Sequence, residues 1–182
     1  MSRKIVIIGG GVIGASVAFH LAEAKAGEVT LLERDKLGSG TTWHSAGNIT
    51  WKPSHFHDQP VLQMLETVER LPKLTGQETG WLTTGRQFIA ISSETLEIFQ
   101  GFAKVAEERG IKGRWIDGAE ARRLNPLLDP SAAKAIWLNP VSGRLNPADI
   151  TAAYAKGARL AGATIREGAT VTAVETRHGR IA

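Results

Sequence analysis

The fold of this chain is decided near its start, by the stretch Ile5-Val6-Ile7-Ile8-Gly9-Gly10-Gly11-Val12-Ile13-Gly14. The four apolar residues predict a buried strand, and the glycines lead into a helix with apolar periodicity. A second apolar run, Val29 to Leu32, predicts another strand, which ends at the acidic residue Glu33. Strand, glycine-rich turn, helix, strand and terminal acid thus follow one another as in a parallel βαβ unit.

The spacing of the glycines predicts a dinucleotide-binding turn. Gly9 permits the tight turn out of the strand, Gly11 leaves room for a pyrophosphate beside the backbone, and Gly14 lets the helix pack close to the strand. The N-terminus of the helix offers unpaired N–H groups and the positive end of its dipole to the phosphates. Glu33 follows Gly14 by 19 residues, where it can accept hydrogen bonds from ribose hydroxyls. A glycine-rich turn in an unrelated α/β protein would leave this acid unexplained.

A segment rich in small and hydroxyl-bearing residues, Ser39 to Gly47, follows the acid. Small residues let the backbone approach a ligand closely. The hydroxyls of Thr41, Thr42 and Ser45 can hydrogen-bond to phosphate or ring atoms. The glycines by themselves do not separate FAD from a nicotinamide dinucleotide, so a nicotinamide-dependent dehydrogenase is the alternative at this point.

Thr42-Trp43-His44-Ser45-Ala46-Gly47 resembles a segment of the dimethylglycine and sarcosine dehydrogenase family, which are FAD-dependent dehydrogenases and oxidases of N-methylated glycines. In that family the histidine of this segment is bonded to the 8α-methyl group of the flavin, and His44 stands in its place. The resemblance therefore implies FAD as the cofactor, held covalently through His44. In the alternative interpretation, His44 only hydrogen-bonds to nearby backbone.

The resemblance continues more loosely over the remainder of the chain. Asn125-Pro126-Leu127-Leu128 and Gly143-Arg144-Leu145-Asn146-Pro147 match the family's pattern, and Val171 falls where the family's backbone contacts the adenine. The chain departs from the family at Gly85-Arg86-Gln87-Phe88, where a Gly-Ser-(apolar)-Arg strand is usual. Arg86 is a candidate for binding a substrate carboxylate.

The fold class implied is α/β, a Rossmann-type FAD-binding domain with the start of an inserted α+β substrate domain. Residues 1–74 and 141–182 are expected to belong to the FAD-binding domain, and residues 75–140 to the substrate domain. The family continues for hundreds of residues beyond the match. We therefore expect a fragment of a longer enzyme, or a truncated reading frame, whose sheet has unpaired edges.

Apart from Arg86, the candidate site residues concern the cofactor, and no catalytic residue is assigned. Arg34 follows the ribose-binding acid and either lines the adenosine site or lies on the surface. His55, His57 and Asp58 lack a further convergent ligand, so no metal site is predicted. The expected cofactor-binding residues are Gly9, Gly11, Val12, Ile13, Gly14, Glu33, Arg34, Ser39, Gly40, Thr41, Thr42, Trp43, His44, Ser45, Ala46, Gly47 and Val171.

The composition of the 182 residues is that of a globular protein, with 42% hydrophobic and 22% charged residues. The absence of cysteine excludes disulfides, Cys-ligated metal centres and thiol catalysis. The net charge of +4 comes from scattered basic residues, which favours anionic ligands over nucleic acid. No apolar run is long enough to span a bilayer. The first strand begins at Ile5 with no presequence before it, so a cytoplasmic protein of bacterial type is expected.

The resemblance implies oxidation of the C–N bond of an N-methylated glycine, such as dimethylglycine or sarcosine, by hydride transfer to the flavin. The partners are then a small amino-acid substrate and an electron acceptor, which is oxygen or an electron-transfer protein. Two alternatives stay open within the same family of folds. One is a non-catalytic, flavin-binding regulatory subunit, and the other is a glycine or D-amino-acid oxidoreductase with a non-covalent flavin.

Periodicity and capping residues also predict the elements that follow the glycine-rich unit. The expected elements are a helix from Asp58 to about Leu71, a strand over Trp81–Ser92 broken at Gly85, a helix over Glu94–Arg109, a short helix capped by Asp117, a strand over Ala135–Leu138, a helix from Asn146 to about Ala161, strands at Ile165 and Val171–Val174, and a hairpin turn over Arg177–Arg180.

Overall fold

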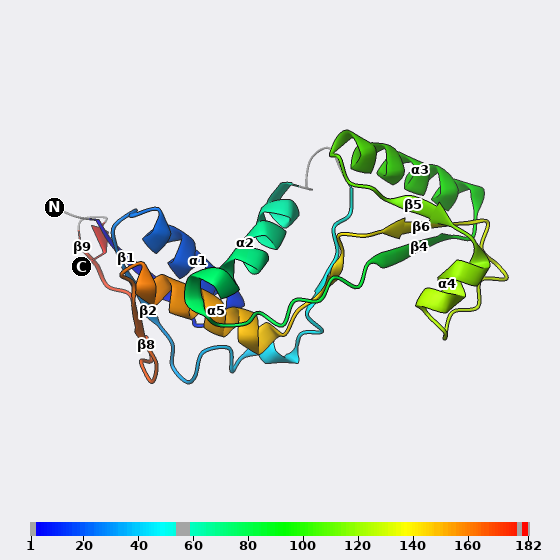
Figure 1. Cartoon of the computed structure of the whole chain (residues 1–182). Coiled ribbons are helices and arrows are strands. Elements are labelled where there is room, and N and C mark those ends of the chain that lie inside the picture. Colours follow the sequence, from blue (N-terminus) through cyan, green and yellow to red (C-terminus); the bar gives the residue numbers. More distant parts are fainter. Residues whose placement is uncertain (1–2, 54–58, 178–179, 182) are drawn as a thin grey trace. The chain divides into compact units, whose positions relative to one another are not determined.

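The computed structural model describes residues 3–53, 59–177 and 180–181 (Figure 1). The chain divides into two compact units. Unit 1 consists of Met1–Gly47, Val68–Gly80 and Leu145–Ala182, and unit 2 consists of Asn48–Thr67 and Trp81–Arg144. The division of the chain between cofactor and substrate expected from the sequence stays a prediction.

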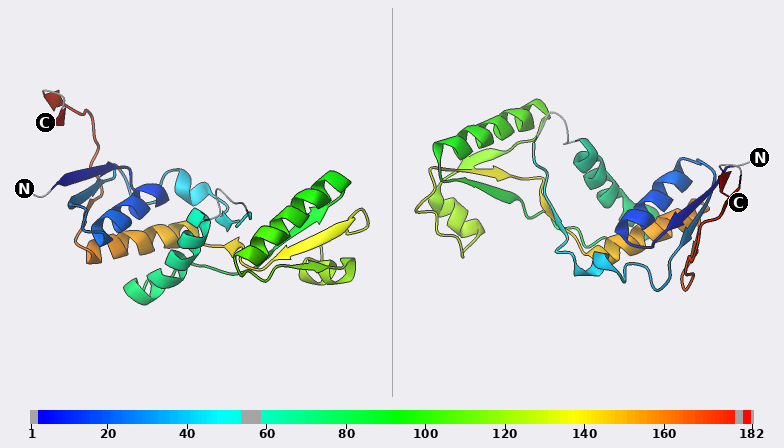
Figure 2. Two further views of the ribbon diagram at one scale, coloured as in Figure 1. Left: turned by 90° about the horizontal axis from the view of Figure 1, so that it is seen from above. Right: turned by 180° about the vertical axis from the view of Figure 1, so that it is seen from behind.

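Unit 1 contains the βαβ unit predicted from the glycine-rich stretch. Its described residues form a parallel sheet of three strands in the order β1-β2-β8. Helix α1 connects β1 to β2, and α5, which leads into β8, lies beside α1 (Figures 1 and 2). The elements are β1 (Lys4–Ile8), α1 (Val12–Glu23), β2 (Glu28–Leu32), the short 3₁₀ helix η1 (Thr41–His44), the last part of α2 (Gln59–Thr75), α5 (Pro147–Leu160), β8 (Thr164–Arg166) and the hairpin strands β9 (Thr176–Arg177) and β10 (Arg180–Ile181).

Small residues allow α1 and α5 to approach closely. A Cβ atom on Gly157 would lie 2.8 Å from Cδ2 of Phe19, which is 1% exposed. Ala15 and Ala18 are fully buried on the same helix as Phe19. The Phe19 ring also contacts the ring of Tyr154, with 5.8 Å between centroids. The pair of helices thus covers one face of the sheet and holds the glycine-rich turn in place.

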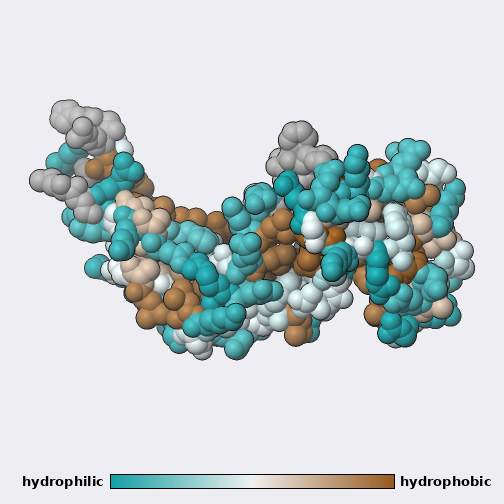
Figure 3. All heavy atoms as spheres, turned by 45° about the horizontal axis from the view of Figure 1, so that its top comes forward, coloured by the Kyte–Doolittle hydropathy of each residue, from teal (hydrophilic) through white to brown (hydrophobic). Residues whose placement is uncertain are grey.

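The prediction that Ile5–Ile8 forms a buried strand is wrong in its burial. Strand β1 forms, but Val6 and Ile8 are 59% and 60% exposed. Side chains alternate between the two faces of a strand. These two residues therefore point to a face that no described element covers. Hydrophobic atoms are visible at the surface of the molecule in Figure 3.

Helix α2 ends at Thr75, later than predicted, and includes Pro72. A proline lacks the N–H that would donate to the carbonyl four residues earlier. That carbonyl belongs to Val68, and it accepts a hydrogen bond of 3.5 Å from the buried hydroxyl of Thr79 instead. The carbonyl that the proline leaves without an N–H donor thus lies beside a hydroxyl of the same unit.

Two predicted strands are also corrected. The strand expected over Trp81–Ser92 with a break at Gly85 forms only after the break, as β4 (Arg86–Ala90). The break itself is confirmed, since Gly85 has a positive φ of 69°, and before it Leu82 makes only an isolated bridge to Arg144. Val171–Val174 form no strand, and the structure gives these residues no ladder partner among the described residues. The predicted hairpin at Arg177–Arg180 is confirmed by the pairing of β9 with β10.

Unit 2 is a small α+β unit. Its described residues form an antiparallel sheet of three strands in the order β4-β6-β5 and a separate pairing of β3 with β7. Adjacent residues of β6 face opposite ways: Trp137 packs in a cluster with Phe102 and Ala106 of α3, whereas Ile136 packs with Ala121 of α4. The elements are β3 (Asn48–Ile49), the first part of α2, β4, α3 (Ser93–Glu108), β5 (Arg114–Ile116), α4 (Gly118–Leu124), β6 (Ala135–Asn139) and β7 (Gly143–Arg144).

The helix starts were predicted best. Asp117 caps α4 by accepting a hydrogen bond of 2.8 Å from the N–H of Glu120. Asn146 caps α5 by accepting one of 2.9 Å from Ala148, with Pro147 in the first turn as predicted. Helix α3 is capped by Ser92 and begins at Ser93, one residue before the predicted start at Glu94. His55, His57, Asp58 and His178 lie outside the described residues.

Candidate dinucleotide-binding site

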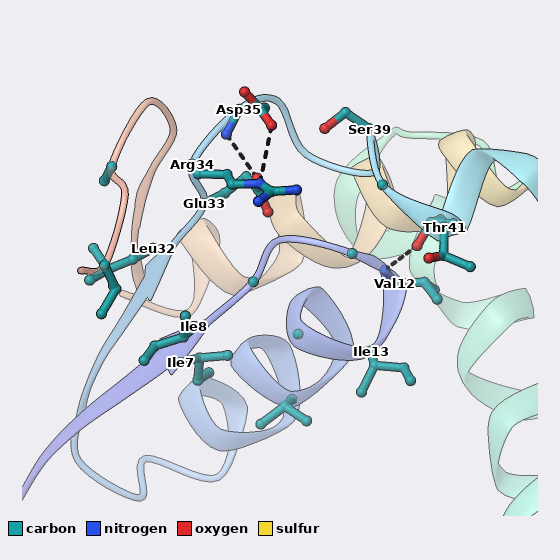
Figure 4. A pocket seen from close by; sticks show the side chains of 18 of the residues that line it. Ile7, Ile8, Val12, Ile13, Leu32, Glu33, Arg34, Asp35, Ser39 and Thr41 are labelled. Atoms are coloured by element: carbon teal, nitrogen blue, oxygen red, sulfur yellow. Dashed lines mark hydrogen bonds and ion pairs between the residues drawn. The ribbon is translucent and has the colours of Figure 1, made fainter. Parts of the chain in front are cut away.

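A pocket of about 920 Å³ opens in unit 1 where β1 and β2 end and α1 begins (Figure 4). This is the edge at which open α/β sheets bind their ligands. The lining residues are Ile7, Ile8, Gly9, Gly11, Val12, Ile13, Gly14, Val17, Leu32, Glu33, Arg34, Asp35, Ser39, Gly40, Thr41, Thr42, Ser45, Ala169, Thr170 and Val171. Thirteen of the seventeen residues predicted to bind the cofactor are therefore brought together.

The glycine-rich turn has the close contacts expected of it. Gly9 has a φ of 105°, and its N–H donates to the carbonyl of Leu32 at 2.8 Å, which joins the turn to the end of β2. A Cβ atom on Gly14 would fall well inside the van der Waals radius of the Gly9 carbonyl oxygen. Only a residue without a side chain fits where the first turn of α1 touches the end of β1.

The N-terminus of α1 faces the pocket without a side-chain cap from its own Gly11. The hydroxyl of Thr42 provides one instead, since Val12 N–H donates to Thr42 Oγ1 at 3.0 Å. A hydroxyl that accepts this bond still carries a proton of its own. Thr42 can therefore donate to a phosphate held at the helix N-terminus, where the helix dipole also favours an anion.

Glu33 is held as a carboxylate at the end of β2. Its two oxygens accept backbone hydrogen bonds, one from Asp35 at 2.8 Å and one from Gly10 at 2.6 Å. These N–H groups lower the pKa of Glu33 below its ordinary value. Each carboxylate oxygen can accept more than one hydrogen bond, so the ionised Glu33 can also receive the hydroxyls of a ribose.

The far wall of the pocket comes from the C-terminal part of the chain. Ala169 N–H donates to the carbonyl of Glu33 at 2.8 Å, and the Glu167 carboxylate accepts from Leu37 N–H at 2.8 Å. These bonds bring Val171 to the pocket as the resemblance implies, together with Ala169 and Thr170. Ala169, Thr170 and Asp35 line the pocket without having been predicted, although each lies within two residues of a predicted site residue.

Four predicted residues do not line the pocket: Trp43, His44, Ala46 and Gly47. Trp43 is 62% exposed and its ring lies against that of His44, with 4.2 Å between centroids. The Nδ1 atom of His44 lies 3.2 Å from the carbonyl oxygen of Gly40. Gly47 is buried, and its carbonyl accepts from Leu145 N–H at 2.9 Å. The segment thus continues from the pocket to a solvent-exposed histidine.

The described part of the chain holds no cluster of three or more His, Asp or Glu side chains that could bind a metal ion. None of its helices combines the length and the apolar character needed to cross a bilayer.

The family of FAD-dependent oxidoreductases, DAO, matches residues 4–182. The chain belongs to this family. Mitochondrial sarcosine dehydrogenase of Mus musculus is 32% identical over 99% of the chain and 21% of that protein. Mitochondrial dimethylglycine dehydrogenase of Rattus norvegicus is 34% identical over 96% of the chain and 20% of that protein. The chain thus spans about a fifth of the length of these relatives.

Solved structures of the family share this fold. The crystal structure of L-proline dehydrogenase from P. horikoshii superposes with a TM-score of 0.86 at 27% identity, over 99% of the chain and 48% of that protein. The predicted α/β fold class and the resemblance to sarcosine and dimethylglycine dehydrogenases are confirmed. Family membership supports FAD over a nicotinamide cofactor. The pocket fits the group, since it joins the N-terminus of α1 and the Thr42 hydroxyl, for the pyrophosphate, to an ionised acid for the ribose.

Proposed function

We propose that this chain is the FAD-binding part of an amine oxidoreductase that oxidises an N-methylated glycine such as sarcosine or dimethylglycine. The proposal is supported above all by the pocket at the N-terminus of α1, which has the parts that a dinucleotide requires, in a chain of the FAD-dependent family. FAD, when bound, supplies the acceptor for the two electrons removed from the C–N bond of the substrate.

The chain's own residues bind and orient the cofactor. The N–H groups that open α1 and the hydroxyl of Thr42 hold the pyrophosphate, and Glu33 accepts hydrogen bonds from the ribose. Val171 and its neighbours cover the adenine. Apolar side chains of Ile13 and Val17 line the same pocket.

We further propose that His44 carries the flavin covalently, through Nε2. A carbonyl oxygen can only accept, so the contact between His44 Nδ1 and the Gly40 carbonyl requires the proton to be on Nδ1. The lone pair of the neutral imidazole is then on Nε2, which is the nucleophilic atom. Because the side chain of His44 is exposed, this atom is accessible to a flavin ring that extends out of the pocket.

The electron acceptor is oxygen or an electron-transfer protein, and both are tested by assaying turnover with oxygen and with an artificial dye. A cytoplasmic location also stays a prediction, since the sarcosine and dimethylglycine dehydrogenases of mammals are mitochondrial.

The experiment is acid denaturation of the full-length protein and of a His44→Ala variant, followed by flavin absorbance of pellet and supernatant. We expect the colour to stay with the wild-type pellet and to move to the supernatant in the variant. Tryptic mapping then finds the flavin on His44. The matched control is His20→Ala, which removes an exposed histidine of α1 and leaves the colour in the pellet.

Other outcomes contradict parts of the proposal. Yellow supernatant from the wild type refutes the covalent link and favours an oxidoreductase with a non-covalent flavin. Bound flavin without turnover of sarcosine or dimethylglycine refutes the substrate assignment and favours the regulatory alternative. Absence of flavin from the purified protein refutes the cofactor assignment itself.

A further inference from the structure

The segment that follows β8 is bonded to the loop that follows the acid of the pocket. Strand β8 ends beside β2, where Arg166 pairs with Leu32, and the N–H of Glu33 donates to the carbonyl of Arg166 at 2.9 Å. The N–H of Ala169 in turn donates to the carbonyl of Glu33 at 2.8 Å. The backbone of Glu33 is therefore held on both sides by a segment from the C-terminal part of the chain.

The same segment also holds the loop over Asp35–Leu37. The N–H of Gly168 donates to the carbonyl of Asp35 at 3.2 Å, and the carboxylate of Glu167 accepts from the N–H of Leu37 at 2.8 Å. Gly168 has a φ of 69°, a conformation that glycine adopts readily and other residues rarely do. Of the bonds between segment and loop named here, the bond of Glu167 is made by a side chain, so a substitution can remove it.

The loop over Asp35–Leu37 orients the carboxylate of Glu33. The N–H of Asp35 donates to one carboxylate oxygen at 2.8 Å, while the N–H of Gly10 donates to the other at 2.6 Å. The bond from Asp35 is the largest cause of the lowered pKa of Glu33. Glu33 and Asp35 line the pocket side by side (Figure 4), whereas Glu167 is not among the lining residues. Contacts thus lead from Glu167, through the loop, to the acid of the pocket.

We propose that Glu167 is a positioning residue for the ribose of the bound dinucleotide. It fixes the loop over Asp35–Leu37, and the N–H of Asp35 then keeps the Glu33 carboxylate in the orientation that receives the ribose hydroxyls. Because the ribose is that of FAD, this role rests on the cofactor assignment proposed above. Loss of Glu167 should weaken recognition of the 2′-hydroxyl more than binding of the phosphates, which are held at the N-terminus of α1.

The test is displacement of FAD from the full-length protein by ADP and by 2′-deoxy-ADP. It is made in a His44→Ala background, where the flavin is not held covalently, and the fluorescence of released FAD gives the affinity of each nucleotide. In this background we expect ADP to bind about tenfold or more tightly than 2′-deoxy-ADP, as for a hydrogen bond to a carboxylate. Glu167→Ala should lower this ratio about threefold or more, because Glu33 is no longer held in one orientation.

Three further variants separate positioning from a general loss of stability. Glu167→Gln keeps an oxygen that can accept from Leu37 N–H but lacks the charge, so its ratio should lie between those of the background protein and Glu167→Ala. Gly168→Ala strains the same segment and should also lower the ratio. The matched control is Glu28→Ala, which removes an exposed glutamate at the opposite end of β2 and should leave the ratio unchanged. Melting curves establish that the variants are folded.

The proposal is overturned if Glu167→Ala keeps the ratio of the background protein, or if it weakens ADP and 2′-deoxy-ADP equally, as a merely structural role would. It is also overturned if Glu28→Ala lowers the ratio as much as Glu167→Ala does. Failure of the proposed function has a different result. In that case the background protein binds no FAD, or ADP does not displace it, and the role of Glu167 is refuted together with the cofactor site.

Discussion

Replacement of Gly14 by alanine adds a single methyl group at the most crowded point of the glycine-rich turn. The new Cβ would fall inside the van der Waals radius of the Gly9 carbonyl oxygen. That oxygen belongs to the backbone, and the N–H of Gly9 donates a hydrogen bond to the carbonyl of Leu32 at the end of β2. The backbone of Gly9 therefore cannot move away from the new methyl group without opening the turn. The matched substitution is Gly101→Ala in the middle of α3, where a Cβ atom would meet nothing within 4 Å.

The two variants should change stability in opposite directions. Alanine is favoured over glycine in a helix by about 1 kcal/mol, and Gly101→Ala should gain about that amount. For Gly14→Ala the gain in helix propensity is at most the same. Overpacking opposes it and destabilises the folded state by about 1–3 kcal/mol, occasionally more. Because the obstacle is backbone rather than a flexible side chain, we expect the upper end of that range and a net loss of about 2 kcal/mol.

Urea unfolding followed by circular dichroism measures both free energies. Titration with FAD followed by flavin fluorescence measures the cofactor affinity, and it is made in a His44→Ala background, where the flavin is not held covalently. A loss of about 2 kcal/mol corresponds to a melting temperature lower by about 4–8 °C in a chain of this size. Gly14→Ala should also weaken FAD binding, whereas Gly101→Ala should not. A Gly14→Ala variant as stable as the wild type, with unchanged FAD affinity, would refute the role assigned to this glycine.

Two further substitutions test the carboxylate of the pocket and the buried amide of unit 2. The lowered pKa of Glu33 means that its carboxylate stabilises the folded state at pH values above its ordinary pKa of 4.5, and that this contribution is lost as the pH falls through the folded value. Glu33→Gln should therefore be less stable than the wild type at pH 7, and the difference should shrink below about pH 4.5; a difference independent of pH contradicts this. Asn139→Ala leaves the Trp51 carbonyl and the Val141 N–H without their buried partner. It should lower the free energy of unfolding in urea by at least about 2 kcal/mol. The control Asn125→Ala removes an exposed side chain and should change that free energy by less than about 0.5 kcal/mol.

The dinucleotide motif could be recognised from sequence because its parts act over short distances. Gly9, Gly11 and Gly14 lie on one turn, and their spacing is a direct consequence of the path from strand to helix. The helix caps at Asp117 and Asn146 were predicted for the same reason, since each side chain bonds to an N–H two or three residues further on. Prediction of these features required no knowledge of the remaining chain.

Other parts of the pocket depend on residues that are far apart in the chain. Thr42 caps α1 from 30 residues away, and its role as a cap was not inferred from its hydroxyl alone. Ala169 and Thr170 reach the pocket because the N–H of Ala169 donates a hydrogen bond to the carbonyl of Glu33. Four residues of the resembling segment, His44 among them, fell outside the pocket lining although the sequence placed them with the cofactor.

By itself the sequence determined the βαβ unit, the acid that ends β2, the starts of the helices and the family. These follow from steric and hydrogen-bonding preferences that act within a few residues. Only the tertiary structure decided that one face of β1 is exposed, that the hydroxyl of Thr79 lies beside the carbonyl freed by Pro72 in α2, and that Arg86 and Lys52 lie over two aromatic rings that contact each other. Those outcomes depend on which distant segments pack together. That choice is made by the burial of the whole chain, and no local pattern of residues contains it.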